Sequence, residues 1–365
     1  MDKNLKRLTI LALIIQSIYL IRELSTKTVE IGFFKALSLP EYIIFLLASA
    51  ILIVTIILLI GNRRLWWVGG LFSVITYQII LIRYVSSITL LAFNITLFIL
   101  VLIGFFFWQF HYQYKKLVQS ILDYEIDDKK VVIRDDLLSL PKPVRKWLEK
   151  SNVVGSEFIQ KAYLEQDGQL RLQPDQKWLD SSAKQFFNAI EPSFIWVVET
   201  KMNNIPILGR DLFFKGKGSM LIKIASLFAV VNEKSSKKLN EATMQRFLGE
   251  IVWFPTAALS KYIKWKEIDD FSAKAIMSYK NVEGEATFFF DKNYNLDKFL
   301  AYRFRDVKDD KRTLWEAKVI KTKKINGILI PVELEASWIP EKDDKFTWYK
   351  FKIKNVKYNE KVPTI

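Results

Sequence analysis

Two side chains that often carry chemistry are absent or nearly absent from this chain of 365 residues. It has no cysteine, which excludes disulfides, cysteine metal sites and thiol catalysis. Its one histidine is His111, so residues 112–365 have no imidazole. This excludes a Ser-His-Asp triad, histidine-ligated zinc and the commonest general base from that region. Any enzyme built there depends on carboxylates, lysine, tyrosine or a bound cofactor, and we expect neither a metal nor a cofactor.

Charge is distributed unevenly along the chain. Residues 1–116 hold 11 Lys and Arg against 4 Asp and Glu, and the remainder holds 43 against 35. Both parts are net positive, so the formal charge of +15 is not one basic patch. A basic surface indicates attraction to anionic lipid headgroups. Nucleic-acid binding is the competing interpretation, but no recognition motif supports it, and we expect no nucleic-acid partner.

Long apolar runs dominate the first third of the chain. Tyr42–Ile60 carries no charge in 19 residues, and Leu65–Ile82 and Ile88–Phe110 are of similar length. A shorter run, Leu8–Ile21, follows three basic residues and has no small-residue cleavage site after it, so we interpret it as a retained helix. Apolar runs of about 18 residues or more match the thickness of a bilayer core. The sequence therefore predicts four transmembrane helices within residues 1–114, with the lipid bilayer as a partner.

The basic residues that flank these runs predict an orientation. With the N-terminus inside, seven Lys and Arg lie on the cytoplasmic side and four on the outer side. This favours a multi-pass protein of the cell membrane whose N-terminus and C-terminal domain are cytoplasmic. If Leu8–Ile21 lay flat on the surface instead, the side of the C-terminal domain would change.

The chain beyond the apolar runs predicts a linker helix over residues 115–136 and a β-rich domain over residues 137–365. Alternating apolar and polar residues, separated by turns rich in Gly, Asn or Asp, indicate short strands. Asp167-Gly168 and Asn326-Gly327 are the strongest turn signals. The strand candidates are Phe158–Leu164, Gln169–Leu172, Lys177–Asn188, Phe194–Met202, Phe213–Ile222, Ala273–Tyr279, Glu285–Asp291, Leu296–Arg305, Leu314–Lys323, Ile328–Trp338 and Phe346–Tyr358.

One helix interrupts these strands. Apolar residues recur at spacings of three and four over Lys238–Val252, and Pro255 follows. We expect a mainly antiparallel α+β domain, a curved sheet or half-barrel, with this helix across one face.

The segment around the helix resembles an uncharacterised bacterial family known only as a domain of unknown function. The motif Arg246-Phe-Leu-Gly-Glu-Ile-Val-Trp-Phe-Pro-Thr-Ala257, followed by Trp265-Lys-Glu-Ile-Asp-Asp-Phe-Ser-Ala273, carries the resemblance, which extends over residues 140–338. The resemblance implies no activity and no catalytic residue. A weaker likeness, of architecture alone, is to the half-barrels of periplasmic lipoprotein carriers, which cup an acyl chain; fold does not fix function.

Three carboxylates are the catalytic candidates: Glu250, Asp269 and Asp270. Paired carboxylates divide acid and base roles when their environments separate their pKa values. An ion pair on the helix surface is the alternative role of Glu250, since Arg246 precedes it by four residues. Asp269 and Asp270 precede a strand, where aspartates commonly shape a turn.

Large aromatic residues are the ligand-binding candidates. They either line an apolar cavity that holds a lipid or fill an ordinary core between sheet and helix. The candidates for a cavity are Trp178, Trp196, Trp253, Phe254 and Trp265.

Three functions follow from these patterns. The first is a domain that binds a lipid, another amphipathic ligand or a partner at the membrane surface. The second is a carboxylate-dependent enzyme acting on a lipid-linked substrate, which requires Glu250 to converge with Asp269 or Asp270 in a concave site. The third is a structural module of a membrane complex, which requires an exposed apolar patch.

Overall fold

The computed structural model describes residues 38–60, 69, 72–73, 75–76, 88–124, 130–341 and 344–360. The chain divides into two compact units, Met1–Gln113 and Tyr114–Ile365. The described residues include four α-helices and one antiparallel sheet of 13 strands.

Two of the predicted apolar spans are helical, as parts of α3 (Leu39–Ile60) and α5 (Ile88–Leu122). Leu8–Ile21 lies outside the described residues, as does most of Leu65–Ile82. Among the described residues, no helix combines the length and the apolarity needed to cross a membrane. The predicted block of four transmembrane helices is therefore wrong, whereas the predicted localisation at the cell membrane stays a prediction.

The first unit shows one reason why the apolar runs did not correctly predict transmembrane helices. Such a run does not by itself distinguish a spanning helix from one packed against other protein. Ala48 and Leu52 of α3 are buried, and the Ser73 hydroxyl donates a hydrogen bond to the Ala48 carbonyl at 3.1 Å. Part of the apolar surface of α3 is therefore used in contacts within its own unit.

The second unit is built on a sheet of 13 strands, all paired antiparallel. Their order is β6-β5-β4-β3-β2-β1-β13-β12-β11-β10-β9-β8-β7. The strands are β1 (Lys161–Leu170), β2 (Leu179–Asn188), β3 (Ser193–Met202), β4 (Ile205–Phe214), β5 (Lys217–Ile224), β6 (Phe228–Glu233), β7 (Ile263–Asp269), β8 (Ser272–Tyr279), β9 (Val282–Phe290), β10 (Leu296–Arg303), β11 (Thr313–Ile325), β12 (Ile328–Ile339) and β13 (Phe346–Tyr358).

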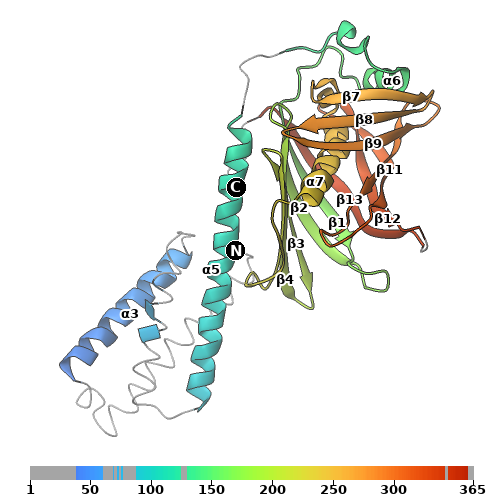
Figure 1. Ribbon diagram of the computed structural model, residues 1–365. Coiled ribbons are helices and arrows are strands. Elements are labelled where there is room, and N and C mark those ends of the chain that lie inside the picture. The colour runs from blue at the N-terminus through green and yellow to red at the C-terminus, as the bar shows by residue number, and fades with distance from the viewer. Residues whose placement is uncertain are drawn as a thin grey trace. The chain divides into compact units, whose positions relative to one another are not determined.

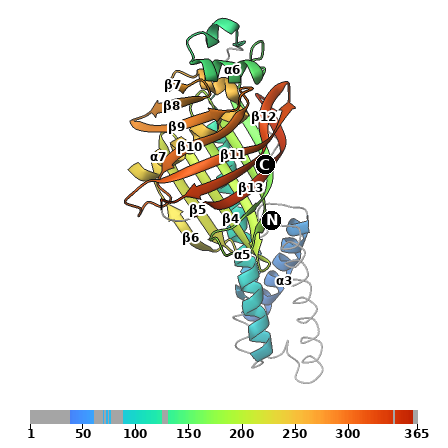
Figure 2. The same ribbon diagram turned by 90° about the vertical axis from the view of Figure 1, so that its right-hand side faces the viewer.

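This strand order makes the sheet curve. Two meanders, β1 to β6 and β7 to β13, join where β1 pairs with β13, so β6 and β7 are the opposite edges. A flat sheet of this size would be about 58 Å wide, because neighbouring strands lie about 4.8 Å apart. The chain between the two edges includes α7 (Lys237–Glu250), whose 14 residues span about 21 Å. The sheet curls, and Figures 1 and 2 show it wrapped around α7.

Helix α7 begins at a clear capping residue and packs on the concave face of the sheet. The Ser236 hydroxyl accepts a hydrogen bond from the Leu239 amide, which satisfies one free N–H of the first turn. Met244, Phe247 and Leu248 are completely buried on its inner face. Two 3-10 turns, η2 (Ile251–Trp253) and η3 (Pro255–Leu259), continue the chain, so the α-helix ends before Pro255.

The end of α5 belongs to the second unit. The Tyr114 ring packs against Phe186 of β2, with ring centroids 6.1 Å apart. The Asn188 side-chain amide donates hydrogen bonds to the carbonyls of Ile121, at 2.8 Å, and Tyr124, at 2.7 Å. A 3-10 turn, η1 (Arg134–Leu137), and α6 (Lys142–Lys150), with Pro143 in its first turn, lead into β1.

One predicted turn is correct and another is wrong. Asn326 and Gly327, both with positive φ, connect β11 to β12 as a tight hairpin. Asp167-Gly168 instead lies within β1. A side chain at Gly168 would lie 2.5 Å from the Lys350 carbonyl oxygen and 2.9 Å from the Tyr349 ring. Glycine is needed there for the close approach of β13 rather than for a turn.

Candidate ligand-binding site

A buried ion cluster lies between α7 and the concave face of the sheet. The Arg246 guanidinium on α7 donates a hydrogen bond to Glu250 Oε1 at 2.8 Å, one turn along the helix. It also donates to Asp211 Oδ2 on β4 at 2.6 Å, and the three side chains are 13%, 10% and 5% exposed. The guanidinium lies over the rings of Phe194 and Trp196, 5.1 and 4.7 Å from their centroids. One cation thus serves two buried carboxylates.

Amide side chains extend this cluster across the sheet. Gln185 on β2 donates to Glu250 Oε2 at 2.7 Å, and Gln166 on β1 donates to Gln185 Oε1 at 3.0 Å. The Trp196 indole N–H donates to Gln166 Oε1 at 3.2 Å, and the Tyr349 hydroxyl on β13 donates to the same oxygen at 3.4 Å. The network therefore connects α7 with β1, β2, β3, β4 and β13.

Burial sets the ionisation of this cluster. Burial raises the pKa of Glu250 above its ordinary value, and the charge and hydrogen bond of Arg246 act in the opposite direction. Burial acts to lower the pKa of Arg246, but Glu250 and Asp211 together raise it above its ordinary value. Arg246 is therefore permanently charged and is the counterion on which both carboxylates depend.

A second buried arginine, Arg303 near the end of β10, lies close to this cluster. Its side chain is 8% exposed, and its guanidinium lies 4.7 Å from the Trp315 ring centroid and 5.9 Å from that of Trp338. Burial and, next, the charge of Arg246 lower the pKa of Arg303 to about 10. Arg303 therefore still carries its charge at neutral pH.

A cavity of about 140 Å³ opens beside these groups, under α7. Most of its walls are aromatic or aliphatic side chains, and the charged residues that line it are Asp211, Arg246, Glu250, Arg303 and Arg305. The aromatic residues that line it are Trp253, Phe299, Phe304, Trp315, Trp338, Trp348, Tyr349 and Phe351.

The three predicted catalytic carboxylates are not brought together. Glu250 is buried in the ion cluster, whereas Asp269 and Asp270 lie on the exposed turn between β7 and β8. Asp269 accepts a hydrogen bond from the Phe271 amide, and Asp270 pairs with Lys142 at 2.8 Å. Glu250 shares no hydrogen-bond or ion-pair partner with either aspartate within the described residues. The convergence that the enzyme hypothesis requires is not seen there.

Of the five predicted ligand-binding aromatics, only Trp253 lines the cavity. Trp196 is held in the polar network, and Phe254 is completely buried against Phe187. Trp178 is half-buried beneath Arg171, and Trp265 packs against Phe288 while its indole N–H donates to the Ala258 carbonyl. Most of these rings thus stabilise the core and the rim of the domain.

Sequence reasoning missed Arg303, although one signal was available. Strand residues two apart share a face, so Phe299, Ala301 and Arg303 point to the same side of β10. An arginine at a position where the neighbouring inward residues are apolar is unusual, because arginine is rarely fully buried unless paired. This pattern identifies Arg303 as a candidate without any motif.

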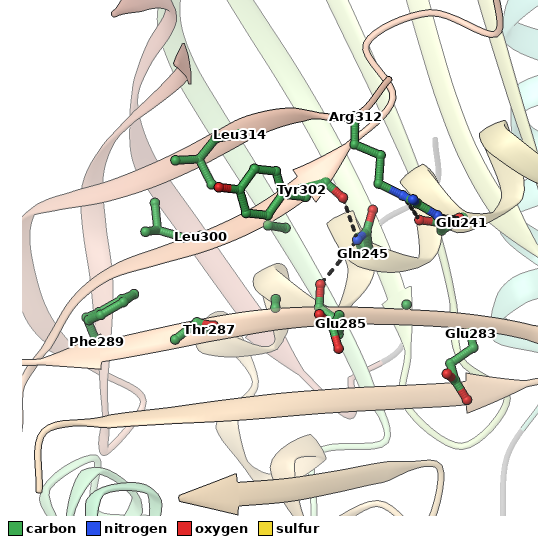
Figure 3. A pocket seen from close by; sticks show the side chains of 13 residues that line it. Glu241, Gln245, Glu283, Glu285, Thr287, Phe289, Leu300, Tyr302, Arg312 and Leu314 are labelled. Atoms are coloured by element: carbon green, nitrogen blue, oxygen red, sulfur yellow. Dashed lines mark hydrogen bonds and ion pairs between the residues drawn. The ribbon is translucent and has the colours of Figure 1, made fainter. Parts of the chain in front are cut away.

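A second, more polar groove of about 490 Å³ lies between β9 and β10 (Figure 3). The two strands pair as far as Leu300 and Thr287, beyond which the structure gives no further pairing. There the Gln245 amide, from α7, donates to the carbonyls of Glu285, at 3.2 Å, and Tyr302, at 3.0 Å. Gln245 thus replaces the missing contacts between the strands. Glu241 at the side of the groove is already bound by Arg312.

Replacing Gln245 by alanine is expected to lower the free energy of unfolding by about 1–2 kcal/mol, since two carbonyls lose their donor. Gln245 is 2% exposed, so water does not readily replace it. Urea unfolding followed by tryptophan fluorescence measures the change. Gln169→Ala is the control, because that amide is exposed and donates a hydrogen bond to the Asp180 side chain. Equal stabilities of the two variants would contradict the role of Gln245.

A family of unknown function (DUF6920) matches residues 138–358, which is more than half of the chain. The chain belongs to this family. The resemblance to an uncharacterised domain family seen in the sequence is thereby confirmed, and the matched region begins before β1 and ends at the last residue of β13. No curated protein matches the chain.

Three solved structures are similar to the DUF6920 chain in part. A DUF1329 family protein from Desulfovibrio piger is 12% identical, with a TM-score of 0.35, over 62% of this chain and 96% of that one. A domain described as an outer membrane lipoprotein-sorting protein from Vibrio parahaemolyticus is 9% identical, with a TM-score of 0.35, over 56% and 87%. A β-barrel-like DUF1849 protein from Brucella abortus is 10% identical, with a TM-score of 0.26, over 55% and 99%.

Proposed function

We propose that the β-rich domain is a binding domain for an amphipathic ligand, which enters the cavity under α7. The observation that carries the proposal is a cavity walled mainly by aromatic and aliphatic side chains, with a few charged groups among them. Pockets for small ligands have this composition, in which apolar walls give affinity and a few polar groups fix orientation.

The size of the cavity limits what it holds. Pockets for drug-sized ligands typically measure roughly 300–1,000 Å³. At about 140 Å³, this cavity holds one chain or ring of a larger molecule. We therefore expect the cavity to hold one hydrocarbon chain or part of one, with any bulkier part of the ligand outside.

Tryptophan fluorescence gives a direct test with the full chain. Four of the tryptophans line the cavity, so a bromine-bearing ligand that enters it quenches their emission. The neutral probe is 12-bromododecan-1-ol, and we expect saturable quenching. Organic extraction of the purified chain, followed by mass spectrometry, should identify a ligand that co-purifies with it.

Narrowing the cavity should weaken this binding. Ala317→Leu adds three carbons to a side chain that lines the cavity, and we expect at least a tenfold loss of affinity for the bromo-alcohol. Ala229→Leu makes the same change on exposed β6 and should leave the affinity unchanged. If the wild-type chain shows no saturable quenching and yields no ligand on extraction, the proposed function is wrong.

A further inference from the structure

Arg303 contacts no group of opposite charge within the described residues. Its guanidinium makes no hydrogen bond and no ion pair there, and its Nε is buried without any acceptor. Its guanidinium instead lies over the faces of Trp315 and Trp338, while Asp211 and Glu250 attract it without contact. A buried cation without a contacting counterion is costly, because its lost hydration is not replaced by hydrogen bonds.

The nearby carboxylates do not relieve this cost by contact. Asp211 Oδ2 and Glu250 Oε1 both accept from Arg246, and Glu250 Oε2 accepts from Gln185. The contacts of these acids are with Arg246, so Arg246 is paired directly with both carboxylates, whereas their charges act on Arg303 only without contact.

Most of the other unsatisfied polar atoms around the cavity are hydrogen-bond donors, as Arg303 Nε is. The indole N–H groups of Trp315 and Trp348, both of which line the cavity, are buried without an acceptor. With Arg303 Nε they make three unpaired donors, against one unpaired acceptor in the cavity lining, Asp211 Oδ1, within the described residues. The excess of unpaired donors favours a ligand group that is rich in acceptors.

We propose that Arg303 binds the anionic group, a carboxylate or a phosphate, of the amphipathic ligand whose hydrocarbon chain occupies the cavity. The guanidinium presents parallel N–H donors in a plane, and both anions accept such paired hydrogen bonds. Stacking on Trp315 and Trp338 orients that plane before the ligand arrives. Because Arg303 is buried, water only weakly screens the attraction between its guanidinium and the anionic group. The inference rests on the proposed function and defines the class of its ligand.

Matched bromine-labelled ligands test this inference on the full chain. The three probes are 12-bromododecanoate, 12-bromododecyl phosphate and the neutral 12-bromododecan-1-ol, and each is titrated against tryptophan emission. We expect at least one anionic probe to bind the wild-type chain tenfold or more tightly than the alcohol. The tighter of the two anions distinguishes a carboxylate ligand from a phosphate ligand.

Substitution of Arg303 should remove this preference. In Arg303→Met, we expect the anionic probe to bind no more tightly than the alcohol binds to the same variant. Arg303→Lys should retain part of the preference, because an ammonium keeps the charge but not the paired donors. Arg134→Met, which removes an exposed arginine on η1, should behave as wild type.

The outcomes separate this inference from the proposed function. If the wild-type chain binds all three probes with similar affinity, or if Arg303→Met keeps the anion preference, the inference is wrong and the binding function stands. If the wild-type chain binds none of them, the proposed function itself fails. Should Arg303→Met not fold, as judged by circular dichroism, the wild-type comparison and Arg303→Lys still decide.

Discussion

Replacing Arg246 by methionine is expected to lower the free energy of unfolding by about 3–5 kcal/mol, as the loss of one partner of a buried ion pair does. Arg246 is the shared donor of Asp211 and Glu250, and its removal leaves both carboxylates buried without a contacting cation. Methionine fills much of the same space, so the expected loss comes from charge rather than from a cavity. Urea unfolding of the full chain, followed by tryptophan fluorescence, measures it.

Two further variants isolate the reason for this loss. Arg246→Lys keeps the charge, but one ammonium does not reproduce the two directed contacts at 2.6 and 2.8 Å, so we expect an intermediate stability. Arg134→Met removes an exposed arginine and should change the stability by less than about 0.5 kcal/mol. A loss below about 1 kcal/mol in Arg246→Met would show that the cluster behaves as a surface pair.

The loss of unfolding free energy in Arg246→Met should also depend on pH. Burial already raises the pKa of Glu250 above its ordinary value, and without Arg246 that pKa rises further. A carboxyl whose pKa is higher in the folded state contributes stability at low pH, and the contribution is lost as the pH rises through the folded pKa. The difference in stability between wild type and variant should therefore be smaller at pH 5 than at pH 8. A difference that does not change between these values would contradict this account.

The strands were largely predictable because the sheet alternates along most of its length. Along the first part of β2, for example, exposed Ser182 and Lys184 flank buried Ala183, which is what a sheet with one wetter face requires. The turn between β4 and β5 was missed, because Phe213–Ile222 reads as one run and only Lys215 and Gly216, both with positive φ, interrupt it. Local pattern indicates strands, but it does not separate two short ones from one long one.

The order of the strands, and with it the cavity, depends on contacts far apart in sequence. Nothing near β1 indicates that it pairs with β13, some 190 residues later, yet that pairing joins the two meanders and curves the sheet under α7. A cavity is the space left by many side chains together, so no single segment encodes it. This is why most of the predicted aromatic candidates proved to be core or rim residues.

The ion cluster shows the same limit at the level of one residue. The spacing of Arg246 and Glu250 predicted an ion pair on an exposed helix surface. The structure shows this pair at 2.8 Å, but it is buried. Its burial follows from Asp211 on β4, Gln185 on β2 and the aromatic rings above the guanidinium. Spacing within a helix predicts which side chains are in contact. The sheet that covers them determines how buried the ion pair is, and therefore how much its loss destabilises the protein.

Gly249→Ala should lower the free energy of unfolding by about 3 kcal/mol, at the upper end of what overpacking a core costs. In most helices this substitution is stabilising, by up to about 1 kcal/mol, because alanine is the better helix former. Here the added methyl group would lie 2.2 Å from the tip of the Phe299 ring. That ring is 2% exposed and is held between Phe288 and Trp315, so the room for it to shift lies in the cavity that it lines.

A double-mutant cycle with Phe299→Leu tests whether this contact is responsible. Phe299→Leu alone should destabilise the protein, but in the Gly249→Ala background it should recover at least about 1 kcal/mol, since the shorter side chain makes room for the methyl group. Because Phe299 and Trp315 line the cavity, the same clash should also disturb ligand entry, and Gly249→Ala should weaken binding of 12-bromododecan-1-ol. Additive effects of the two substitutions would mean that α7 shifts as a body away from β10. In that case the position of α7 on the sheet, rather than the Phe299 ring alone, determines the width of the cavity.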